Sequence, residues 1–246
     1  MPQLSVIIPA YNEEKRLPTT LESVHKFLTD SERSFEIIVV DDGSSDGTKD
    51  VVNAFAGEHC GIRLITHRPN QGKGYSVRAG MLKAEGDLLL LDDADGASPI
   101  EELIRLEEAI QGGADVAIGS RAKPGNETVV RALSHRKHMG NTFNLVVQKL
   151  VLSGIYDTQC GFKLFKRDVA GQLFSLATLN RYAFDVEILF LARLKGYKIA
   201  EVPINWTNVE GSKINLVTDP MSMLWEIGKI LLNKACGRYG KVSATK

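Results

Sequence analysis

The sequence predicts an α/β fold in which helices cover both faces of a mostly parallel central sheet. Two observations lead to this prediction. First, five short apolar runs have the length of buried strands, and they lie at residues 4–8, 35–40, 62–65, 88–91 and 116–119. Second, segments whose apolar residues recur at helical spacing separate several of these runs. Strands that alternate with helices are typical of parallel sheets with helices on both sides.

Each of the first three strands leads into a predicted helix. Apolar side chains recur every three or four positions over residues 17–28, and again over residues 51–55. The third strand is followed by the glycine-containing loop at residues 68–74, which leads into a helix that ends near Gly86. The sequence contains no repeat, low-complexity tract or clear linker, so we expect one domain.

The pattern continues past the fourth strand and then weakens. Ser98 can cap a helix whose first turn contains Pro99, and Glu101 completes a capping box. Beyond Arg121 the predicted elements are less regular. They are a polar loop over residues 122–138, an amphipathic helix over 143–151, a strand over 161–165, a helix over 185–195 and a half-buried strand over 201–206, which Pro203 makes either an edge strand or a bulged one.

The composition is that of an ordinary globular protein. Of the 246 residues, 43% are hydrophobic and 24% are charged, and the formal net charge is zero, so we expect no nucleic-acid partner. The three cysteines are widely spaced without a C-x-x-C pair, which fits a reducing compartment. We see no signal peptide, and no apolar run approaches the ~18 residues of a membrane span. We therefore expect a soluble or peripheral protein.

The last part of the chain has a different character. We expect a catalytic domain over residues 1–218, followed by an amphipathic helix and a basic tail over residues 219–246. Residues 221–232 are rich in large apolar side chains, and lysines follow them. Such a helix suits a membrane interface, but the same side chains could pack on their own domain or form a homodimer contact. The sequence leaves these three roles open.

An acidic cluster follows directly on the fourth strand. Asp93 and Asp95 are two positions apart, so their side chains share one face of an extended backbone. Two neighbouring carboxylates repel each other unless a cation lies between them, and hard oxygen ligands suit Mg²⁺ or Mn²⁺. A solvated acidic turn is the alternative interpretation of the cluster taken alone.

Two further strand ends make the metal site the better interpretation. Polar residues follow the first strand at residues 9–14 and the second at residues 41–44. Parallel strands bring these ends to the same rim of the sheet, where ligands bind in open α/β folds. There Asp42 can bond a base or ribose, Tyr11 can stack on a base, and Lys73 can reach phosphate oxygens. The rim is thus suited to a nucleotide.

These strand ends resemble glycosyltransferase family 2. The resemblance rests on residues 6–13, on residues 39–48 and on the Asp93-Ala94-Asp95 motif, which together span the chain to Arg121. It implies a GT-A fold, a nucleotide-sugar donor, a divalent metal and inversion at the anomeric carbon. The segment 157–165 is similar to polyprenyl-phosphate glycosyltransferases.

Three further segments, at residues 70–74, 205–206 and 209–215, resemble the dolichyl-phosphate glucosyltransferase branch. This implies UDP-glucose as the donor and a polyprenyl or dolichyl phosphate as the acceptor. Eukaryotic members of the branch begin with a membrane span and some bacterial relatives end in several, whereas this chain resembles the soluble-core prokaryotic members. We expect a cytoplasmic protein, peripheral on the cytoplasmic membrane face.

The resemblance also implies roles for individual residues. The metal ligands are Asp93 and Asp95, and the nucleotide-sugar contacts are Pro9, Ala10, Tyr11, Glu13, Asp42, Lys73 and Asp93. The acceptor-phosphate contacts are Arg121, Arg136 and Lys163, and Asp157 joins Asp93, Asp95, Arg121 and Arg136 in the catalytic set. Asp185 and Glu187 open a helix, where acids favour the helix dipole, so they stay outside this set.

The basic segment at residues 121–138 bears on the acceptor. It carries five Lys and Arg residues against one acid, which fits a phosphate acceptor or merely a solvated loop. A phosphate monoester is largely ionised at neutral pH and needs cations, whereas a hydroxyl acceptor needs a base, for which Asp157 or Asp185 are candidates. Other donors, namely GDP-mannose or a UDP-N-acetylhexosamine, and a binding module without turnover remain alternatives.

Overall fold

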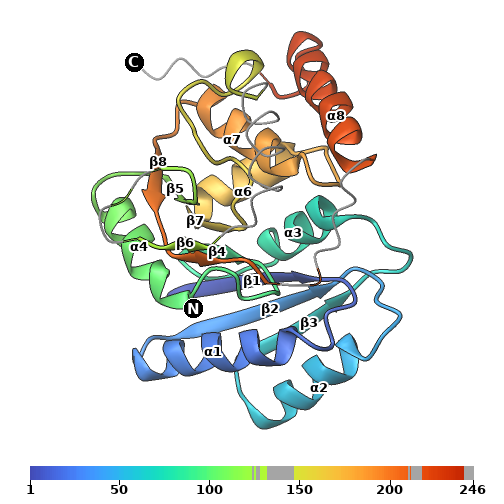
Figure 1. Ribbon diagram of the computed structural model, residues 1–246, viewed down its shortest axis with the longest axis vertical. Helices are drawn as coiled ribbons and strands as arrows, with labels where there is room; N and C mark the ends of the chain where they lie inside the picture. Colours follow the sequence, from blue (N-terminus) through green and yellow to red (C-terminus); the bar gives the residue numbers. More distant parts are fainter. Residues whose placement is uncertain (124, 126–127, 132–146, 210, 212–217, 241–246) are drawn as a thin grey trace.

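A seven-stranded sheet forms the centre of the molecule, in the order β3-β2-β1-β4-β7-β5-β8 (Figure 1). The computed structural model describes residues 1–123, 125, 128–131, 147–209, 211 and 218–240. The strands are β1 (Leu4–Ala10), β2 (Phe35–Asp41), β3 (Ile62–Thr66), β4 (Leu88–Asp92), β5 (Val116–Ser120), β7 (Phe162–Lys166) and β8 (Ile199–Pro203). A separate small sheet pairs β6 (Val130–Arg131) with β9 (Trp206–Thr207).

Helices cover both faces of the sheet, as the sequence predicts. One face packs against α1 (Leu17–Asp30), α2 (Thr48–Glu58) and α4 (Leu103–Gln111), and α4 follows the short 3₁₀ helix η1 (Ile100–Glu102). The other face packs against α3 (Lys73–Met81), α6 (Arg167–Leu176), α7 (Phe184–Leu194) and α8 (Thr218–Ala235). Alternate residues of each central strand enter the two cores, because successive side chains of a strand point to opposite faces.

The strand directions place the predicted site. Strands β3, β2, β1 and β4 run parallel, so the carboxyl ends of β1, β2 and β4 meet at one rim. Strand β7 is antiparallel to both β4 and β5, and β8 is an edge strand parallel to β5. The predicted mostly parallel sheet and the edge position of β8 are confirmed. The reversed direction of β7 brings the start of that strand, at Phe162, beside Asp92 at the end of β4.

Two local predictions need correction. Strand β1 does not end before Pro9 but continues through it to Ala10, in register with β2. The predicted capping box at Ser98 does not form: Pro99 takes the cap position, no side chain caps the helix, and the chain enters η1. Of the helix predicted over residues 143–151, positions 147–150 are helical, and positions 143–146 lie outside the described residues.

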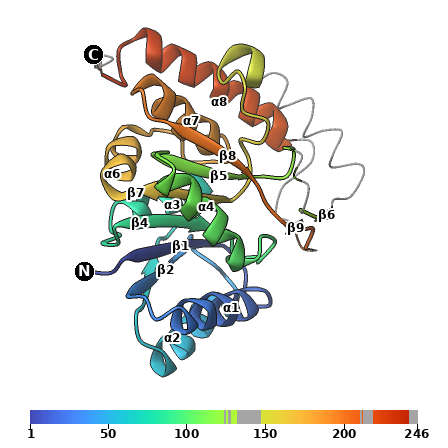
Figure 2. The same ribbon diagram turned by 90° about the vertical axis from the view of Figure 1, so that its left-hand side faces the viewer.

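Helix α8 packs on the domain with one side and leaves the other exposed. Met223, Ile227 and Ile230 belong to the core shared with α7, whereas Met221 and Trp225 are 72% and 71% exposed. Figure 2 shows α8 beside α7, at the end of the molecule opposite α1 and α2. The division of the chain at residue 218 stays a prediction. The inner side of α8 packs into the same core as α7.

Candidate active site

The acidic cluster lies at the rim, directly after β4. Asp92 ends the strand and is 2% exposed, while Asp93 and Asp95 lie beyond it and are half-buried. Burial and the charges of Asp93 and Asp95 raise the pKa of Asp92 well above its usual range. Burial and the charge of Asp93 also raise the pKa of Asp95. Carboxylates that disfavour each other's ionisation in this way form a site that a cation would stabilise.

The backbone of Gly161, just before β7, lies against this cluster. A Cβ atom at Gly161 would overlap the Asp93 carboxylate, so a side chain at this position cannot be accommodated without movement. The antiparallel insertion of β7 therefore forms one wall of the acidic cluster. In the sequence, the one sign of this close contact is the presence of a glycine between Cys160 and Phe162.

Lys73 is the first residue of α3 and points at the acidic cluster. Its Nζ lies 2.6 Å from Asp93 Oδ1. Although burial lowers the pKa of Lys73, the charges of Asp93 and Asp185 raise it above the usual value, so the ammonium stays charged. Close packing explains why glycines stand on both sides of Lys73. Cβ atoms at Gly72 and Gly74 would meet the segment 179–184, and Gly72 has a φ of +100°.

Asp42 holds the loop that presents Lys73. It follows β2, is 3% exposed, and accepts backbone N–H bonds of 2.8 Å from Gln71 and from Gly72. Both carboxylate oxygens are thus used to hold this loop at the rim. The expected nucleotide contact at Asp42 is therefore also a structural link between β2 and α3.

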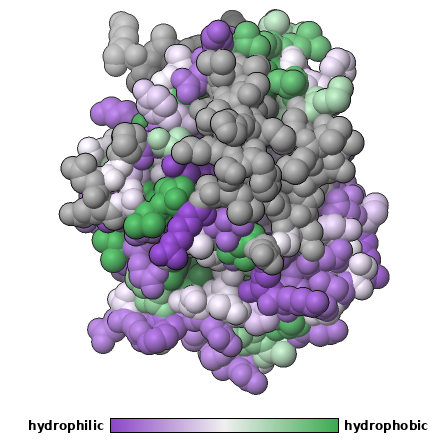
Figure 3. All heavy atoms as spheres, in the orientation of Figure 1, coloured by the Kyte–Doolittle hydropathy of each residue, from purple (hydrophilic) through white to green (hydrophobic). Residues whose placement is uncertain are grey.

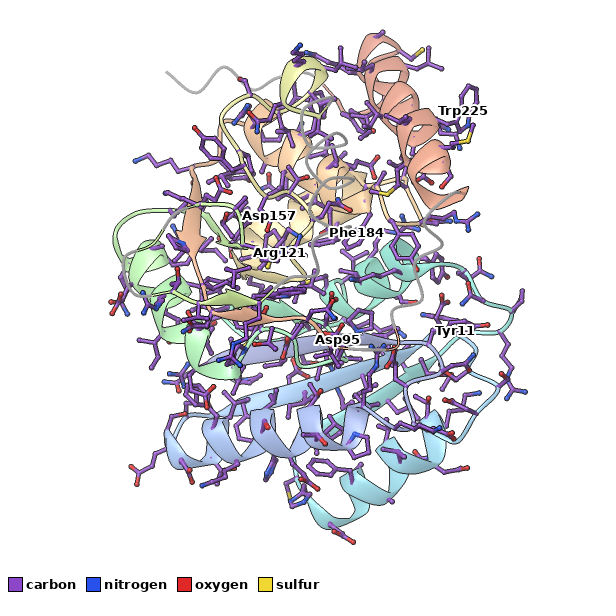
Figure 4. The ribbon with its side chains drawn as sticks, in the orientation of Figure 1. Tyr11, Asp95, Arg121, Asp157, Phe184 and Trp225 are labelled. Atoms are coloured by element: carbon purple, nitrogen blue, oxygen red, sulfur yellow. The ribbon has the colours of Figure 1, made fainter. Side chains whose placement is uncertain are left out.

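The end of β1 supplies the other predicted nucleotide contacts. Pro9 is half-buried and Ala10 is buried, while Tyr11 is 40% exposed at the rim. Asn12 adopts a φ of 54° and binds the loop after β2, since its backbone N–H donates to Ser44 Oγ at 2.9 Å. Tyr11 is consequently presented beside the β2 end, as the stacking role requires (Figure 4).

Glu13 is paired with a residue that sequence reasoning missed. Arg16 donates to both oxygens of Glu13, at 2.7 and 2.5 Å. A third nitrogen of the same guanidinium lies 3.9 Å from Asp95 Oδ2. Arg16 therefore connects the strand-end motif of β1 to the acidic cluster. The three-residue spacing of Glu13 and Arg16 was the available signal.

Arg121, directly after β5, and Asp157 form a two-pronged ion pair, and Figure 4 shows the two residues next to each other. The Arg121 side chain donates to the two Asp157 oxygens at 2.7 and 2.8 Å, and its backbone N–H donates at 2.9 Å. The guanidinium also lies 5.3 Å from the ring centre of Trp206. Burial raises the pKa of Asp157, but the charge and hydrogen bonds of Arg121 hold it below its usual range. This carboxylate is therefore a weak base.

Hydrogen bonds to a half-buried glutamate, Glu201, support that ion pair. Glu201 on β8 accepts a bond from Ser120 Oγ at 2.8 Å and another from the backbone N–H of Asp157, also at 2.8 Å. It also accepts from the backbone N–H of Tyr156. The edge strand therefore fixes the segments on both sides of Arg121 and Asp157.

Lys163 lies in a different setting from the predicted one. It is 1% exposed on β7, its Nζ lies 2.5 Å from Asp185 Oδ1, and it also donates to the carbonyl of Cys160. An acceptor phosphate contact at Lys163 does not fit this burial. Burial raises the pKa of Asp185, although the charges of Lys163 and Lys73 lower it. Arg136 lies outside the described residues.

The residues present suit a divalent cation that shares its ligands with substrate. Within the described ranges, no group of three or more His, Cys, Asp or Glu side chains could hold a metal alone. Asp93 and Asp95 offer two carboxylates, and Mg²⁺ is usually bound by one or two carboxylates together with substrate phosphates. Lys73 would supply a second positive charge for the same phosphates, next to that of the cation. The site thus fits a nucleotide diphosphate and its cation.

Such a rim, on a mostly parallel sheet, suits an enzyme that acts on a phosphorylated ligand. Comparison with known proteins gives the family: residues 5–174 match glycosyl transferase family 2. The chain therefore belongs to glycosyl transferase family 2 and is a glycosyltransferase. This confirms the class of enzyme that the sequence motifs predict.

Several relatives share most of the chain. It is 39% identical to the dolichyl-phosphate beta-glucosyltransferase of Dictyostelium discoideum over 239 residues, which cover 92% of this chain and 73% of the relative. It is 38% identical to the enzyme of that name from Homo sapiens over 225 residues, covering 86% and 69%. The resemblance to this branch is thereby confirmed.

Solved structures confirm the GT-A fold. Glucosyl-3-phosphoglycerate synthase from Mycobacterium tuberculosis, in complex with Mn²⁺, UDP-glucose and phosphoglyceric acid, aligns with a TM-score of 0.68 at 18% identity. The alignment covers 99% of this chain and 82% of that protein. A second structure of that enzyme, with UDP alone, gives 0.68 at 19% identity over the same shares of the two chains.

Proposed function

We propose that this enzyme transfers glucose from UDP-glucose to a polyprenyl or dolichyl phosphate, with inversion at the anomeric carbon and with Mg²⁺ or Mn²⁺. The observation that carries the proposal is the arrangement along one rim of the Asp93–Asp95 cluster with Lys73, and of the Arg121–Asp157 ion pair. The first group suits a donor diphosphate and the second an acceptor phosphate. The names of the relatives from Dictyostelium and human support the same reaction.

The residues that would bind the nucleotide-sugar donor lie after the strands β1, β2 and β4. Tyr11 is exposed for stacking on the base, and Asp42 fixes the loop that holds Lys73 beside Asp93. Asp93 and Asp95 would hold the divalent cation, which when bound neutralises charge on the departing diphosphate. Lys73 would stabilise the same charge, because its ammonium lies beside Asp93 and remains protonated.

The acceptor end favours a phosphate over a hydroxyl group. A hydroxyl acceptor needs a base, and Asp157 is a poor one because Arg121 lowers its pKa. Asp185 is buried and ion-paired with Lys163. A phosphate acceptor is already ionised and requires a cation to hold it. Arg121 is half-buried with its guanidinium oriented by Asp157, which suits it to that task.

The lipid acceptor implies a membrane surface, and α8 offers a suitable face. Its exposed side includes Met221, Leu224, Trp225 and Leu232, with Lys229 nearby on the helix. Hydrophobic atoms gather at the top right of Figure 3, where α8 lies, and Trp225 points away from the domain in Figure 4. An amphipathic helix with an apolar face and basic residues binds at the lipid headgroup boundary.

No helix among the described residues is long and apolar enough to cross a bilayer. We propose that α8 holds the enzyme as a peripheral protein on the cytoplasmic membrane face. All three cysteines are free, which agrees with a reducing compartment. A homodimer through the same face of α8 is the competing arrangement, and it would appear as a concentration-dependent mass in analytical ultracentrifugation without detergent or lipid.

The experiment is a transfer assay with purified protein, Mn²⁺, radiolabelled UDP-glucose and a polyprenyl phosphate in detergent. The proposal predicts labelled lipid, its loss on adding EDTA, and a rate lower by about 10²- to 10³-fold in Asp95→Ala. The matched control is Asp30→Ala, because Asp30 is an exposed acid at the end of α1 that is paired with Lys26. Parallel reactions with GDP-mannose and a UDP-N-acetylhexosamine test the donor. Full activity in Asp95→Ala, or transfer from another donor alone, would overturn it.

A further inference from the structure

Glu187 is a buried carboxylate outside the rim. It lies on α7, is 0% exposed, and accepts four hydrogen bonds from neutral groups. Oε2 accepts from the backbone N–H groups of Thr178 and Leu179 at 2.9 and 2.8 Å. Oε1 accepts from the hydroxyl groups of Thr178 and Tyr239, both at 2.7 Å. A buried carboxylate group is stable only when hydrogen bonds of this kind replace its lost hydration, so the arrangement has a strict geometry.

The segment that Glu187 holds, residues 178–181, packs against the loop that carries Lys73. The backbone N–H of Tyr75 donates to the carbonyl of Asn180 at 3.1 Å. Cβ atoms at Gly72 and Gly74 would collide with the carbonyls of Asn180 and Leu179. Backbone therefore lies directly against backbone on both sides of Lys73.

Helix α3 is tied to the same segment by a side chain. Arg78 donates to the carbonyl of Ala177 at 3.1 Å and to Asn180 Oδ1 at 2.8 Å. The start of α3 thus cannot shift relative to residues 177–181 without breaking these bonds and the Asn180–Tyr75 bond. Because interiors are closely packed, a displacement of residues 178–181 passes to Lys73.

The chain beyond α8 completes the network. Tyr239 is 1% exposed, and its hydroxyl donates to Glu187. Asn233, near the end of α8, donates to Thr178 Oγ1 at 3.1 Å and to Tyr239 Oη at 3.2 Å. The C-terminal part of the described chain therefore reaches the segment that supports Lys73, although it lies far from Lys73 in the sequence.

We infer that Glu187 and Tyr239 are positioning residues for the donor diphosphate, acting through residues 178–181 on Lys73. The C-terminal helix and the residues after it are then coupled to donor binding as well as packed on the domain. This inference rests on the proposed function only for the identity of the donor. Binding of UDP reports on Lys73 whether or not transfer occurs.

The test measures the Kd for UDP with Mn²⁺ by calorimetry, together with the KM values for UDP-glucose and polyprenyl phosphate. Tyr239→Phe removes one donor from the buried carboxylate, and we expect the UDP Kd and the donor KM to rise about three- to tenfold with an unchanged acceptor KM. Glu187→Gln keeps one oxygen for the two N–H groups but puts an NH2 group, which cannot accept a hydrogen bond, opposite the hydroxyls of Thr178 and Tyr239. We therefore expect it to raise the UDP Kd and the donor KM at least as much as Tyr239→Phe.

The matched control is Tyr197→Phe. The Tyr197 hydroxyl donates to Gln172 at 2.6 Å, and Tyr197 follows the end of α7 that is opposite Glu187's hydrogen-bonded segment in the sequence. We expect this variant to retain the wild-type Kd for UDP. A general loss of packing would instead lower the melting temperature in Tyr239→Phe without changing the UDP Kd, and that result would overturn the inference.

A double-mutant cycle gives the sharpest version of the test. If Tyr239 acts through Lys73, then Tyr239→Phe should change the UDP Kd in the wild-type background but not in Lys73→Ala. Equal effects of Tyr239→Phe in both backgrounds would contradict the route through Lys73. Wild-type protein that binds UDP but transfers no sugar would count against the proposed function alone, since the cycle would still be measured on binding.

Discussion

The ammonium of Lys73 lies 2.6 Å from a carboxylate oxygen of Asp93, at the end of β4 and the start of α3. One positive charge therefore already compensates the acidic cluster before any ligand is present. A divalent cation bound by Asp93 and Asp95 has to share Asp93 with this ammonium, whereas a donor diphosphate would be attracted by both cations. The same lysine should hence oppose metal binding alone and favour binding of the nucleotide.

Replacing Lys73 separates these two effects. In Lys73→Ala, Mn²⁺ alone should bind several-fold more tightly, because a like charge near the site is removed. UDP in the presence of saturating Mn²⁺ should bind about tenfold more weakly, because a charge-assisted contact to phosphate is lost. Electron paramagnetic resonance titration measures the free metal, and calorimetry measures UDP binding. A loss of Mn²⁺ affinity in Lys73→Ala would contradict this account of the ion pair.

Arg121→Lys should weaken binding of the acceptor without affecting binding of the donor. Lysine keeps the charge but cannot form the two parallel bonds to Asp157, so the cation loses its fixed orientation. We expect the KM for polyprenyl phosphate to rise about tenfold while the KM for UDP-glucose stays unchanged. Arg33→Lys is the control, since Arg33 makes a comparable ion pair with Glu107 away from the rim. A selective rise in the donor KM would place Arg121 at the other substrate.

The three cysteines should differ in reactivity. Burial raises the pKa of the Cys160 thiol to about 11, whereas Cys60 and Cys236 are exposed. At pH 8 a thiol of that pKa is only ~0.1% thiolate, and the thiolate is the reactive form. Iodoacetamide should therefore label Cys60 and Cys236 in the native protein and Cys160 only after unfolding, as mass spectrometry of peptides would show. Rapid native labelling of Cys160 would mean that the segment before β7 is accessible.

A histidine pair gives the fold a pH dependence. The rings of His25 and His59 lie 4.3 Å apart between α1 and α2, and burial and the charge of His59 lower the pKa of His25. The unfolded chain therefore binds this proton more readily, so the free energy of unfolding should fall as the pH drops through about 6.5. His25→Phe keeps an aromatic ring beside Phe35 and Phe55 and should flatten that part of the curve. Urea unfolding between about pH 5 and 7.5 measures the free energy of unfolding. If this free energy varied with pH equally in the wild type and in His25→Phe, His25 would not be the source of the pH dependence.

The rim was predictable because its information is local. Each of β1, β2 and β4 is a short apolar run followed by polar residues, and parallel strands then bring those residues together by geometry. The acidic pair, Tyr11 and Asp42 all lie at such ends. Arg121 at the end of β5 follows the same rule.

The rest of the site depends on contacts between distant segments. The direction of β7 is set by pairing with β4 and β5, which no periodicity within residues 161–166 encodes. Lys163 is buried because its partner Asp185 comes from a helix 22 positions away. Glu187 was interpreted from helix position alone, yet it binds Tyr239, which is 52 positions further along. Charged residues whose partners are this remote give no signal in a single sequence.

The central claim is that the acceptor is a phosphate held by cations. The most direct measurement compares two acceptors of identical chain length, a polyprenyl phosphate and the corresponding polyprenol, with radiolabelled UDP-glucose and Mn²⁺. The account predicts labelled product with the phosphate and none with the alcohol, because Arg121 is an oriented cation and its partner Asp157 is a weak base. Glucosylation of the alcohol at a comparable rate would contradict it.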